Sequence, residues 1–331
     1  MLVNTLKSNQ PFVIIIISLA GLALWLFSFI DPVLIEIPSD QIYYPFYNTI
    51  SELFSYNSFY SILISFLLVL LQAFLLIQFN KKYILIPHRT YLPAFFYLIL
   101  SSSILQLHRL NPVIIGTIFI FISLSYLFST YRADYALNKV YLAGFFVSIA
   151  SLFWAPFAVF FILIWISLLI LRPFIGREWT VGLLGFLTPY LFVFVYYYVF
   201  ASQQQLEMVV NEFVKSFYIL TGAAALHFSY YIFYGLLLLV ILSASYVILF
   251  NYQKKKIKNR KYFEINWWFF VISLMLFFLF EHVSYEIIYL ISIPISFLLT
   301  DYYYSTRKSW YLNSILLLFY ASLVYIQITA H

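Results

Sequence analysis

Two adjacent residues, His108 and Arg109, form the polar turn whose side chains are best suited to bind a substrate. They lie between two apolar stretches, and Leu110 separates them from the pair Asn111-Pro112. An arginine guanidinium donates paired hydrogen bonds to phosphate oxygens, and a histidine exchanges protons near neutral pH. We therefore interpret His108 and Arg109 as substrate phosphate-binding residues. The alternative is an arginine that only reaches lipid headgroups from a helix end.

A second set of candidates is acidic. Residues 31–56 contain no lysine or arginine, and their carboxylates are Asp31, Glu36, Asp40 and Glu52. Near a low-dielectric surface the pKa of a carboxyl group rises, which suits a general base. Asp31, Glu36 and Asp40 are therefore the candidate catalytic residues. The alternative is a solvated loop that obeys the usual charge distribution of membrane proteins.

Three further ionisable residues, His227, Glu281 and His282, are secondary candidates because we expect them on the same face as Arg109. The sequence lacks a Gly-rich phosphate loop, an H-E-x-x-H motif and a G-x-S-x-G motif, so nucleotide hydrolysis is not expected. It also lacks cysteine, which excludes disulfides and thiolate metal sites. We expect no cofactor and no metal site. A divalent metal bound by the carboxylates of the acidic segment is the alternative.

The composition shows what kind of scaffold must position these residues. Of the 331 residues, 64% are hydrophobic and only 9% are charged. Soluble domains are about 45–50% apolar and about 25% charged. A chain this apolar cannot cover itself with polar surface, so lipid is its natural solvent. Tyr, Phe and Trp make up 23% of the chain, and Tyr and Trp favour membrane interfaces.

Apolar stretches of the length of a membrane crossing recur along the whole sequence. A spanning helix needs about 20 mostly apolar residues. The segments predicted in this way are roughly 11–30, 57–79, 91–107, 111–129, 140–154, 156–171, 180–200, 228–250, 267–280, 286–300 and 309–327. We expect an all-α polytopic bundle of about 11 segments that forms a single integral membrane domain over residues 1–331. The proline in Trp154-Ala155-Pro156 predicts a break, giving two thin crossings or a re-entrant hairpin.

The distribution of basic residues predicts the orientation. With a cytoplasmic N-terminus, all of the 18 lysines and arginines except Arg109 and Lys215 fall inside. This agrees with the positive-inside rule, and it predicts outer loops at 31–56 and 201–227 and a cytoplasmic basic loop at 251–266. The net charge of +6 therefore reflects topology, and we expect membrane lipids as partners and no nucleic acid.

Several stretches resemble an uncharacterised family of bacterial polytopic inner-membrane proteins. They are RTYLPAFFYLILSS (89–102), YLAGFFVSIASLFWAPFAVFF (141–161), RPFIGREW (172–179) and GFLTPYLF (185–192). More distantly, the arrangement resembles the C-superfamily membrane glycosyltransferases and the polymerases and ligases of surface polysaccharides. That resemblance implies a polyprenyl-phosphate sugar donor bound at Arg109. It also implies a base at one of the three candidate carboxylates of the acidic segment.

The leading functional hypothesis is an enzyme of the bacterial inner membrane that acts at the outer face on a lipid-linked sugar or other lipid phosphate. Its partners would be membrane lipids and a polyprenyl-linked substrate, and the sequence carries no signal for an oligomeric state. A transporter or lipid flippase is the first alternative, and a non-catalytic scaffold of an envelope assembly is the second. The helix interiors contain almost no ionisable residues, which counts against ion-coupled transport.

The predicted orientation can be tested with reporter fusions. Fusions after Leu53 and after Gln204 should report a periplasmic location, and a fusion after Lys258 should report a cytoplasmic one. The charge bias of the short loops is the physical reason. A cytoplasmic signal at Leu53 would overturn the orientation.

Overall fold

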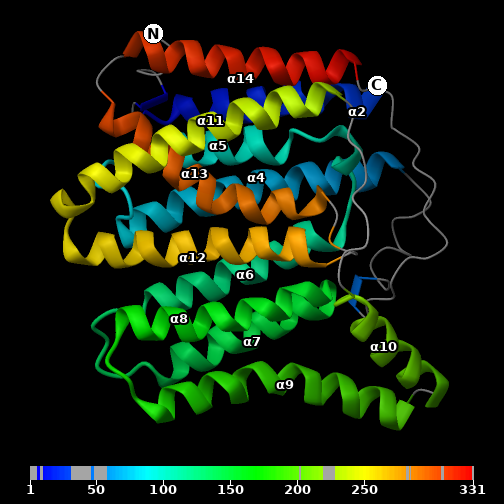
Figure 1. The fold of residues 1–331 in the computed structure, drawn as a ribbon. Helices are drawn as coiled ribbons and strands as arrows, with labels where there is room; N and C mark the ends of the chain where they lie inside the picture. Colours follow the sequence, from blue (N-terminus) through cyan, green and yellow to red (C-terminus); the bar gives the residue numbers. More distant parts are fainter. Residues whose placement is uncertain are drawn as a thin grey trace.

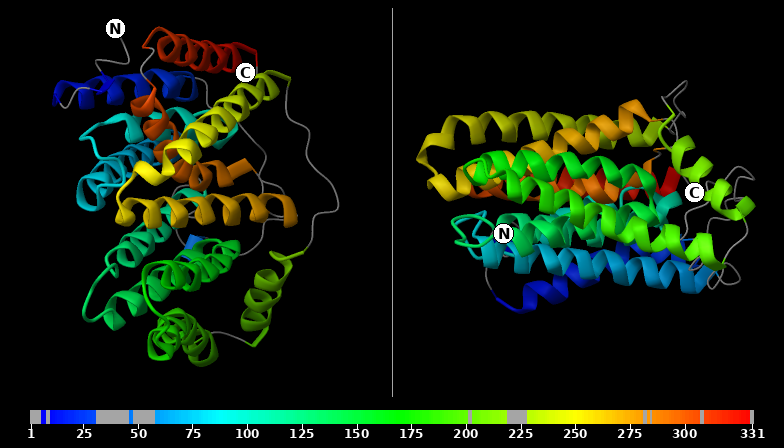
Figure 2. Two further views of the ribbon diagram at one scale, coloured as in Figure 1. Left: turned by 60° about the vertical axis from the view of Figure 1, so that its left-hand side comes forward. Right: turned by 90° about the horizontal axis from the view of Figure 1, so that it is seen from below.

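The chain folds into an all-α bundle whose helices lie side by side, as seen in the computed structural model (Figure 1). The structure describes residues 6–7, 10–30, 46–47, 58–200, 203–218, 228–280, 283, 285–306 and 309–329. Consecutive helices alternate in direction. Their connections therefore fall at two opposite ends of the bundle, which the two further views also show (Figure 2).

Membrane-type helices make up most of the bundle. The long apolar ones are α2 (Phe12–Ile30), α4 (Ser58–Tyr83), α9 (Gly176–Phe200), α11 (Phe228–Asn251), α12 (Ile257–Leu279) and α13 (Ile288–Ser305). The others are α5 (Leu92–Ser101), α6 (Pro112–Phe128), α7 (Leu137–Phe153), α8 (Phe161–Leu171) and α14 (Ser309–Thr329). Within the described residues, 6 helices have the length and apolarity to cross a membrane. The all-α membrane class is therefore confirmed, and the number of crossings and the orientation stay predictions.

The two ends of the bundle differ in charge. The end at which α4, α6, α8 and α11 finish is called the basic end here, because the clustered lysines and arginines lie there. The opposite end, called the Arg109 end, carries the connection between α5 and α6. It also carries the amphipathic helix α10 (Gln203–Lys215), which lies at an angle beyond α9 (Figure 1).

Helix boundaries at the basic end differ from those that apolarity predicts. α12 begins at Ile257, so most of the expected basic loop at 251–266 is helical. The remainder is Tyr252–Lys254, a 3₁₀ turn (η3), and the two residues after it. Apolarity marks the depth of the membrane and not the end of a helix, and lysine and arginine are good helix formers.

Helices α5 and α13 form the centre of the bundle and pack against each other. All ten residues of α5 are buried, as are nearly all residues of α13. The hydroxyl groups of Ser292, Ser296 and Thr300 in α13 donate to carbonyl oxygens of their own helix. A central helix can therefore carry small polar residues without leaving an unpaired group in an apolar surrounding.

A buried ion pair ties the connections together at the basic end. The Arg172 guanidinium meets the Glu178 carboxylate through two contacts, Nε to Oε2 at 3.0 Å and Nη2 to Oε1 at 2.9 Å. Nη1 of the same arginine donates to the carbonyl oxygens of Thr130 at 3.0 Å and Ala133 at 2.6 Å. These contacts join α9 to the α6–α7 connection, so the stretch RPFIGREW has a structural role.

The break predicted at Trp154 is confirmed. α7 ends at Phe153, Trp154 adopts an extended conformation, and the 3₁₀ helix η2 (Ala155–Phe160) leads into α8. From the rise per residue of α-helices and 3₁₀ helices, α7 is about 26 Å long and η2 together with α8 is about 28 Å long. Both lengths are close to a hydrocarbon core of about 30 Å. These lengths favour two thin crossings over a shallow re-entrant loop.

Helices α7 and α9 approach so closely that only glycine fits at the contact. A Cβ atom on Gly185 would overlap the carbonyl oxygen of Tyr141, and one on Gly144 would overlap the carbonyl oxygen of Gly182. Both obstacles are backbone atoms of the facing helix, so they cannot move aside cheaply. Small residues that let two backbones meet are a principal source of helix association in lipid.

We predict that Gly185→Ala lowers the stability of the bundle by about 1–3 kcal/mol, the usual cost of overpacking. Thermal unfolding of the purified protein in detergent, followed by tryptophan fluorescence, measures the effect. Gly235→Ala in α11 is the matched control, because nothing lies within 4 Å of its added Cβ. The control should keep or slightly raise the melting temperature, since alanine favours a helix more than glycine does. Equal melting temperatures for both variants would contradict this account of the α7–α9 contact.

Candidate functional site

The candidate site is built on an interruption between α5 and α6. α5 ends at Ser101, the 3₁₀ turn η1 (Leu105–Leu107) follows, and α6 begins at Pro112. Among residues 102–111 only Gln106 and Arg109 are not fully buried. Irregular backbone at membrane depth is tolerated only where other parts of the protein satisfy its polar groups. The position of Arg109 therefore depends on which side chains pair with this segment.

Side chains from three parts of the chain pair with the backbone of the interrupted segment. The Tyr289 hydroxyl of α13 donates to the Leu107 carbonyl at 2.7 Å, and the Tyr47 hydroxyl donates to the Leu110 carbonyl at 2.9 Å. The Leu110 amide donates to the Ser61 hydroxyl of α4, also at 2.9 Å. These three bonds fix the backbone on both sides of Arg109.

Asn111 ends the interruption by capping α6. Its side-chain oxygen accepts from the Ile114 amide at 2.9 Å, and its amide group donates to the Arg109 carbonyl at 3.2 Å. Pro112 occupies the first turn, where a missing N–H costs nothing. The Asn-Pro pair that follows the polar turn thus starts a helix and holds Arg109 in place.

His108 is buried and fully engaged with the protein itself. Its ring stacks on Trp25 of α2 with centroids 4.0 Å apart, and Trp25 in turn donates to the Ser102 hydroxyl at 2.8 Å. His108 Nε2 lies 3.3 Å from the Ser102 carbonyl, which can only accept, so Nε2 carries the hydrogen. In the neutral ring Nδ1 then accepts from the Ser28 hydroxyl at 2.7 Å.

Burial lowers the pKa of His108 to about 3, so its imidazole is neutral at physiological pH. A neutral ring with both nitrogens bonded inside the protein has no group left for a phosphate. These contacts favour a structural role for His108, and its interpretation as a phosphate-binding residue stays a prediction. His108 joins α2 to the interrupted segment.

Arg109 remains at the edge of the protein with a carboxylate nearby. Its side chain is half-buried and lies within electrostatic range of Glu286, in the 3₁₀ turn η4 (Tyr285–Ile287) before α13. Among the described residues neither group takes part in an ion pair shorter than 4 Å. The Arg109 charge therefore acts on the Glu286 carboxyl group, and the two groups do not form a direct ion pair.

Tyr47 lies beside both charges. Burial is the main reason that the pKa of its hydroxyl rises to about 12; the Glu286 charge adds to the rise and the Arg109 charge opposes it. The phenol therefore stays protonated and serves as a hydrogen-bond donor. Arg109, Glu286, Tyr47, Tyr289 and Asn111 are together called the Arg109 cluster.

The Arg109 cluster has the parts for phosphate binding and proton transfer. A guanidinium can hold phosphate oxygens, and a carboxylate can accept a proton from a hydroxyl group. No group of three or more metal-binding side chains occurs within the part of the chain that the structure describes. The chemistry that the described cluster offers is thus that of a cation, a carboxylate and neutral phenols.

All the other candidate residues from the sequence lie outside the described residues. These are Asp31, Glu36, Asp40, His227, Glu281 and His282. Their roles stay predictions. The structure does place η4, which contains Glu286, against α6 at the Arg109 end.

Sequence reasoning missed the partners of Arg109. Glu286 and Tyr289 are three residues apart at the start of α13, and Tyr47 lies in the acidic outer segment. The spacing of Glu286 and Tyr289, which would put both on one helical face, is the only local signal. It does not identify the segment that they face.

Comparison with known proteins identifies a family but no activity. Residues 34–331 match DUF6427, which is described as a family of unknown function. No curated protein and no solved structure matches the chain. The resemblance to membrane glycosyltransferases therefore stays a prediction.

We predict that His108 makes the stability of the protein depend on pH. A histidine with a depressed folded-state pKa stabilises the fold above its unfolded pKa of about 6.5, and this contribution is lost as the pH falls. Between pH 7.5 and pH 5 the loss should be about 2 kcal/mol for a shift of this size. His108→Gln, which can still pair with Ser28 and Ser102, should remove most of it.

Thermal unfolding in detergent at the two pH values measures this effect. The matched control is His88→Gln, since His88 is exposed at the basic end and stacks on Tyr304. The control should keep the pH dependence of the unmodified protein. An unchanged pH dependence in His108→Gln would show that His108 is not the responsible group.

Proposed function

The chain belongs to DUF6427, a family of unknown function, and from the Arg109 cluster we propose that it is a membrane enzyme acting on a lipid-linked sugar or other lipid phosphate. One observation carries the proposal: the half-buried Arg109 guanidinium lies within electrostatic range of the Glu286 carboxylate, and no ion pair closes either group among the described residues. The positive-inside rule disfavours an arginine at the end that it places outside, so the presence of Arg109 there favours a functional role.

The proposed reaction is transfer of a sugar from a polyprenyl phosphate to an acceptor hydroxyl. The acceptor oxygen forms a bond to the anomeric carbon, and the bond from that carbon to the phosphate oxygen breaks. The electron pair leaves with the polyprenyl phosphate, whose oxygens Arg109 stabilises. The hydroxyl proton passes to a carboxylate, for which Glu286 is the described candidate and Asp31, Glu36 and Asp40 are the alternatives.

The proposal includes the location and orientation of the protein. We place the protein in the bacterial inner membrane with the Arg109 end outside, because the positive-inside rule puts the basic end in the cytoplasm. Polyprenyl phosphates are anchored in the bilayer, so their phosphate would lie at the level of the interrupted segment. A lipid substrate could reach Arg109 from the side without a path through the bundle.

Transport of a lipid is the second candidate, and one observation favours it. The α5–α6 and α7–α8 connections both consist of 3₁₀ helix and buried irregular backbone. Non-helical backbone that is buried in a membrane protein lines the substrate sites of many transporters. The two hypotheses differ in their need for an acceptor: a transferase consumes an acceptor hydroxyl, whereas a flippase moves the intact lipid without one.

We predict that Arg109→Ala weakens binding of polyprenyl phosphate by roughly 10- to 100-fold, the usual worth of a charge-assisted pair of hydrogen bonds. Arg109→Lys should restore only part of the affinity, because lysine lacks the paired fork. Glu286→Gln should leave binding intact and abolish sugar transfer. Native mass spectrometry of the purified protein with added polyprenyl phosphate measures binding. Incubation with a polyprenyl-linked sugar donor and an acceptor measures transfer.

Arg177→Ala is the matched control, since Arg177 is an exposed arginine at the basic end and should bind the lipid phosphate as the unmodified protein does. Equal binding by Arg109→Ala and Arg177→Ala would remove Arg109 from the site. Translocation of the lipid without an acceptor in proteoliposomes, retained in Glu286→Gln, would replace the transferase proposal with the transport one.

A further inference from the structure

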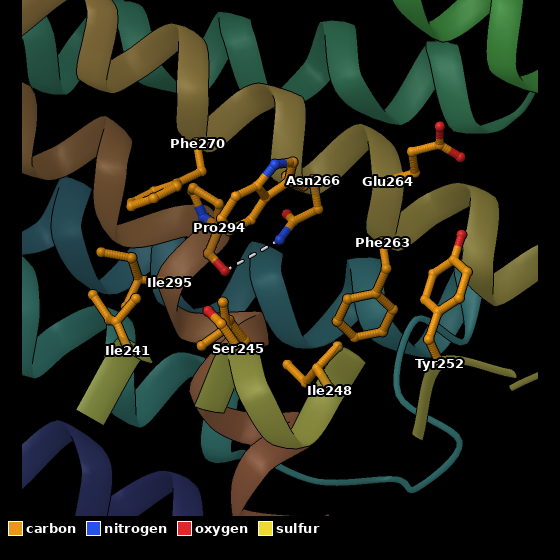
Figure 3. A pocket seen from close by; sticks show the side chains of 12 residues that line it. Ile241, Ser245, Ile248, Tyr252, Phe263, Glu264, Asn266, Phe270, Pro294 and Ile295 are labelled. Atoms are coloured by element: carbon orange, nitrogen blue, oxygen red, sulfur yellow. Dashed lines mark hydrogen bonds between the residues drawn. The ribbon is translucent and has the colours of Figure 1, made fainter. Parts of the chain in front are cut away.

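A second site is a pocket between α11, α12 and α13 that extends from the middle of these helices toward the basic end (Figure 3). Its volume is about 230 Å³, which is below the roughly 300–1,000 Å³ of pockets that enclose a drug-sized molecule. Most of its lining is apolar and includes Ile241, Ile248, Phe270, Ile295 and Leu298. A pocket of this size and chemistry suits one hydrocarbon chain better than a compact polar ligand.

The polar groups inside the pocket do not call for a charged ligand. The Asn266 amide donates to the Pro294 carbonyl at 3.2 Å, the bond that is drawn in Figure 3. Ser245 contributes a small hydroxyl side chain, and the Glu264 carboxylate points away from the other lining side chains. The interior is therefore closer to the hydrocarbon phase than to water.

The flanks of the pocket belong to the lipid-facing surface. Trp267, which lines it, is half exposed, and on α11 the neighbouring Leu238, Leu242 and Tyr246 are well exposed. In a membrane protein such apolar surface faces acyl chains. A chain of a neighbouring lipid can therefore enter sideways, without passing through the core.

Two of the aromatic rings that line the pocket lie near the basic end, and each has a cation close to it. The Arg260 guanidinium lies 5.9 Å from the centroid of the Tyr252 ring, and the Lys255 ammonium lies 3.6 Å from that of Phe263. Lys255 is already paired with Asp301 at 2.6 Å. Arg260 takes part in no ion pair within the described residues, so its charge is available to a phosphate.

We propose that this pocket binds one acyl chain of an anionic phospholipid, whose phosphate lies at Arg260. The apolar cavity and the Arg260 cation, which lies near the Tyr252 ring that lines it, match the two parts of such a lipid. Clustered lysine and arginine next to a membrane helix attract anionic headgroups. This site is independent of the proposed enzyme activity, because none of its lining residues belongs to the Arg109 cluster.

Native mass spectrometry of the purified full-length protein, titrated with phosphatidylglycerol or phosphatidylcholine of the same acyl chains, tests the proposal. The protein should bind one phosphatidylglycerol about tenfold more tightly than phosphatidylcholine, the order expected for one charge-assisted contact. Ser245→Phe, which fills the pocket, should abolish this binding. Arg260→Ala should bring the two affinities together.

Two matched controls separate the pocket from ordinary lipid contact. Ser314→Phe makes the same substitution on α14, away from the pocket, at a serine whose hydroxyl bonds within its own helix. Arg132→Ala removes an exposed arginine elsewhere at the basic end, which lies 5.5 Å from the Tyr131 ring centroid. Both controls should keep the preference for phosphatidylglycerol. Equal loss in Ser245→Phe and Ser314→Phe, or no effect of Arg260→Ala, would overturn the proposal.

A fluorescence measurement keeps the test decisive if Ser245→Phe does not fold. Phosphatidylglycerol with brominated chains should quench Trp267 at low lipid concentration, with saturation. Trp267→Phe should remove that saturable component. Quenching that rises without saturation, and equally in both proteins, would mean that the lipid only surrounds the bundle.

Discussion

The need to pair every buried backbone polar group governs the structure of this protein. Helices satisfy that need internally, so each interruption must be repaired by side chains from elsewhere. Between α5 and α6 the repair comes from Ser61 of α4, Tyr289 of α13 and Tyr47. Because these bonds hold the carbonyls and the amide on both sides of Arg109, the guanidinium projects from a fixed backbone. The candidate site is thus a consequence of how the interruption is stabilised.

The second determinant is close contact between helices. In lipid there is little hydrophobic drive for helices to associate, so van der Waals packing and polar pairs carry the interaction. Gly144 and Gly185 let α7 and α9 meet at backbone distance, and Arg172 with Glu178 joins α9 to the α6–α7 connection. On the other side of the bundle, the serines and threonine of the central α13 satisfy themselves within their own helix. The polar side chains named here therefore either bond to another segment of the chain or form a hydrogen bond within their own helix.

These two determinants explain how far the sequence alone could lead. Composition is enough to predict an all-α membrane bundle, and Pro156 is enough to predict the break after α7. The start of α12 at Ile257 was not predictable from apolarity, since a helix can continue into the water with a charged sequence. The burial of His108 was not predictable from its own turn, because it depends on Trp25 and Ser28 of α2, which is distant in the sequence. Glu286 was missed as the neighbour of Arg109 because only the packing of α13 against the interrupted segment brings the two together.

Arg109 and Lys215, the two basic residues that depart from the positive-inside rule, differ in their surroundings. Lys215 forms an ion pair with Glu212, three residues earlier on α10, at 2.6 Å. That contact forms within one exposed helix and needs no other part of the fold. Arg109 instead lies within electrostatic range of Glu286, a carboxylate from a distant element, without forming a direct ion pair with it. Such an arrangement forgoes the stability of a direct ion pair, whereas it suits a ligand that carries both an anionic phosphate and an exchangeable proton. This difference between the two exceptions is the reason to look for function at Arg109 and not at Lys215.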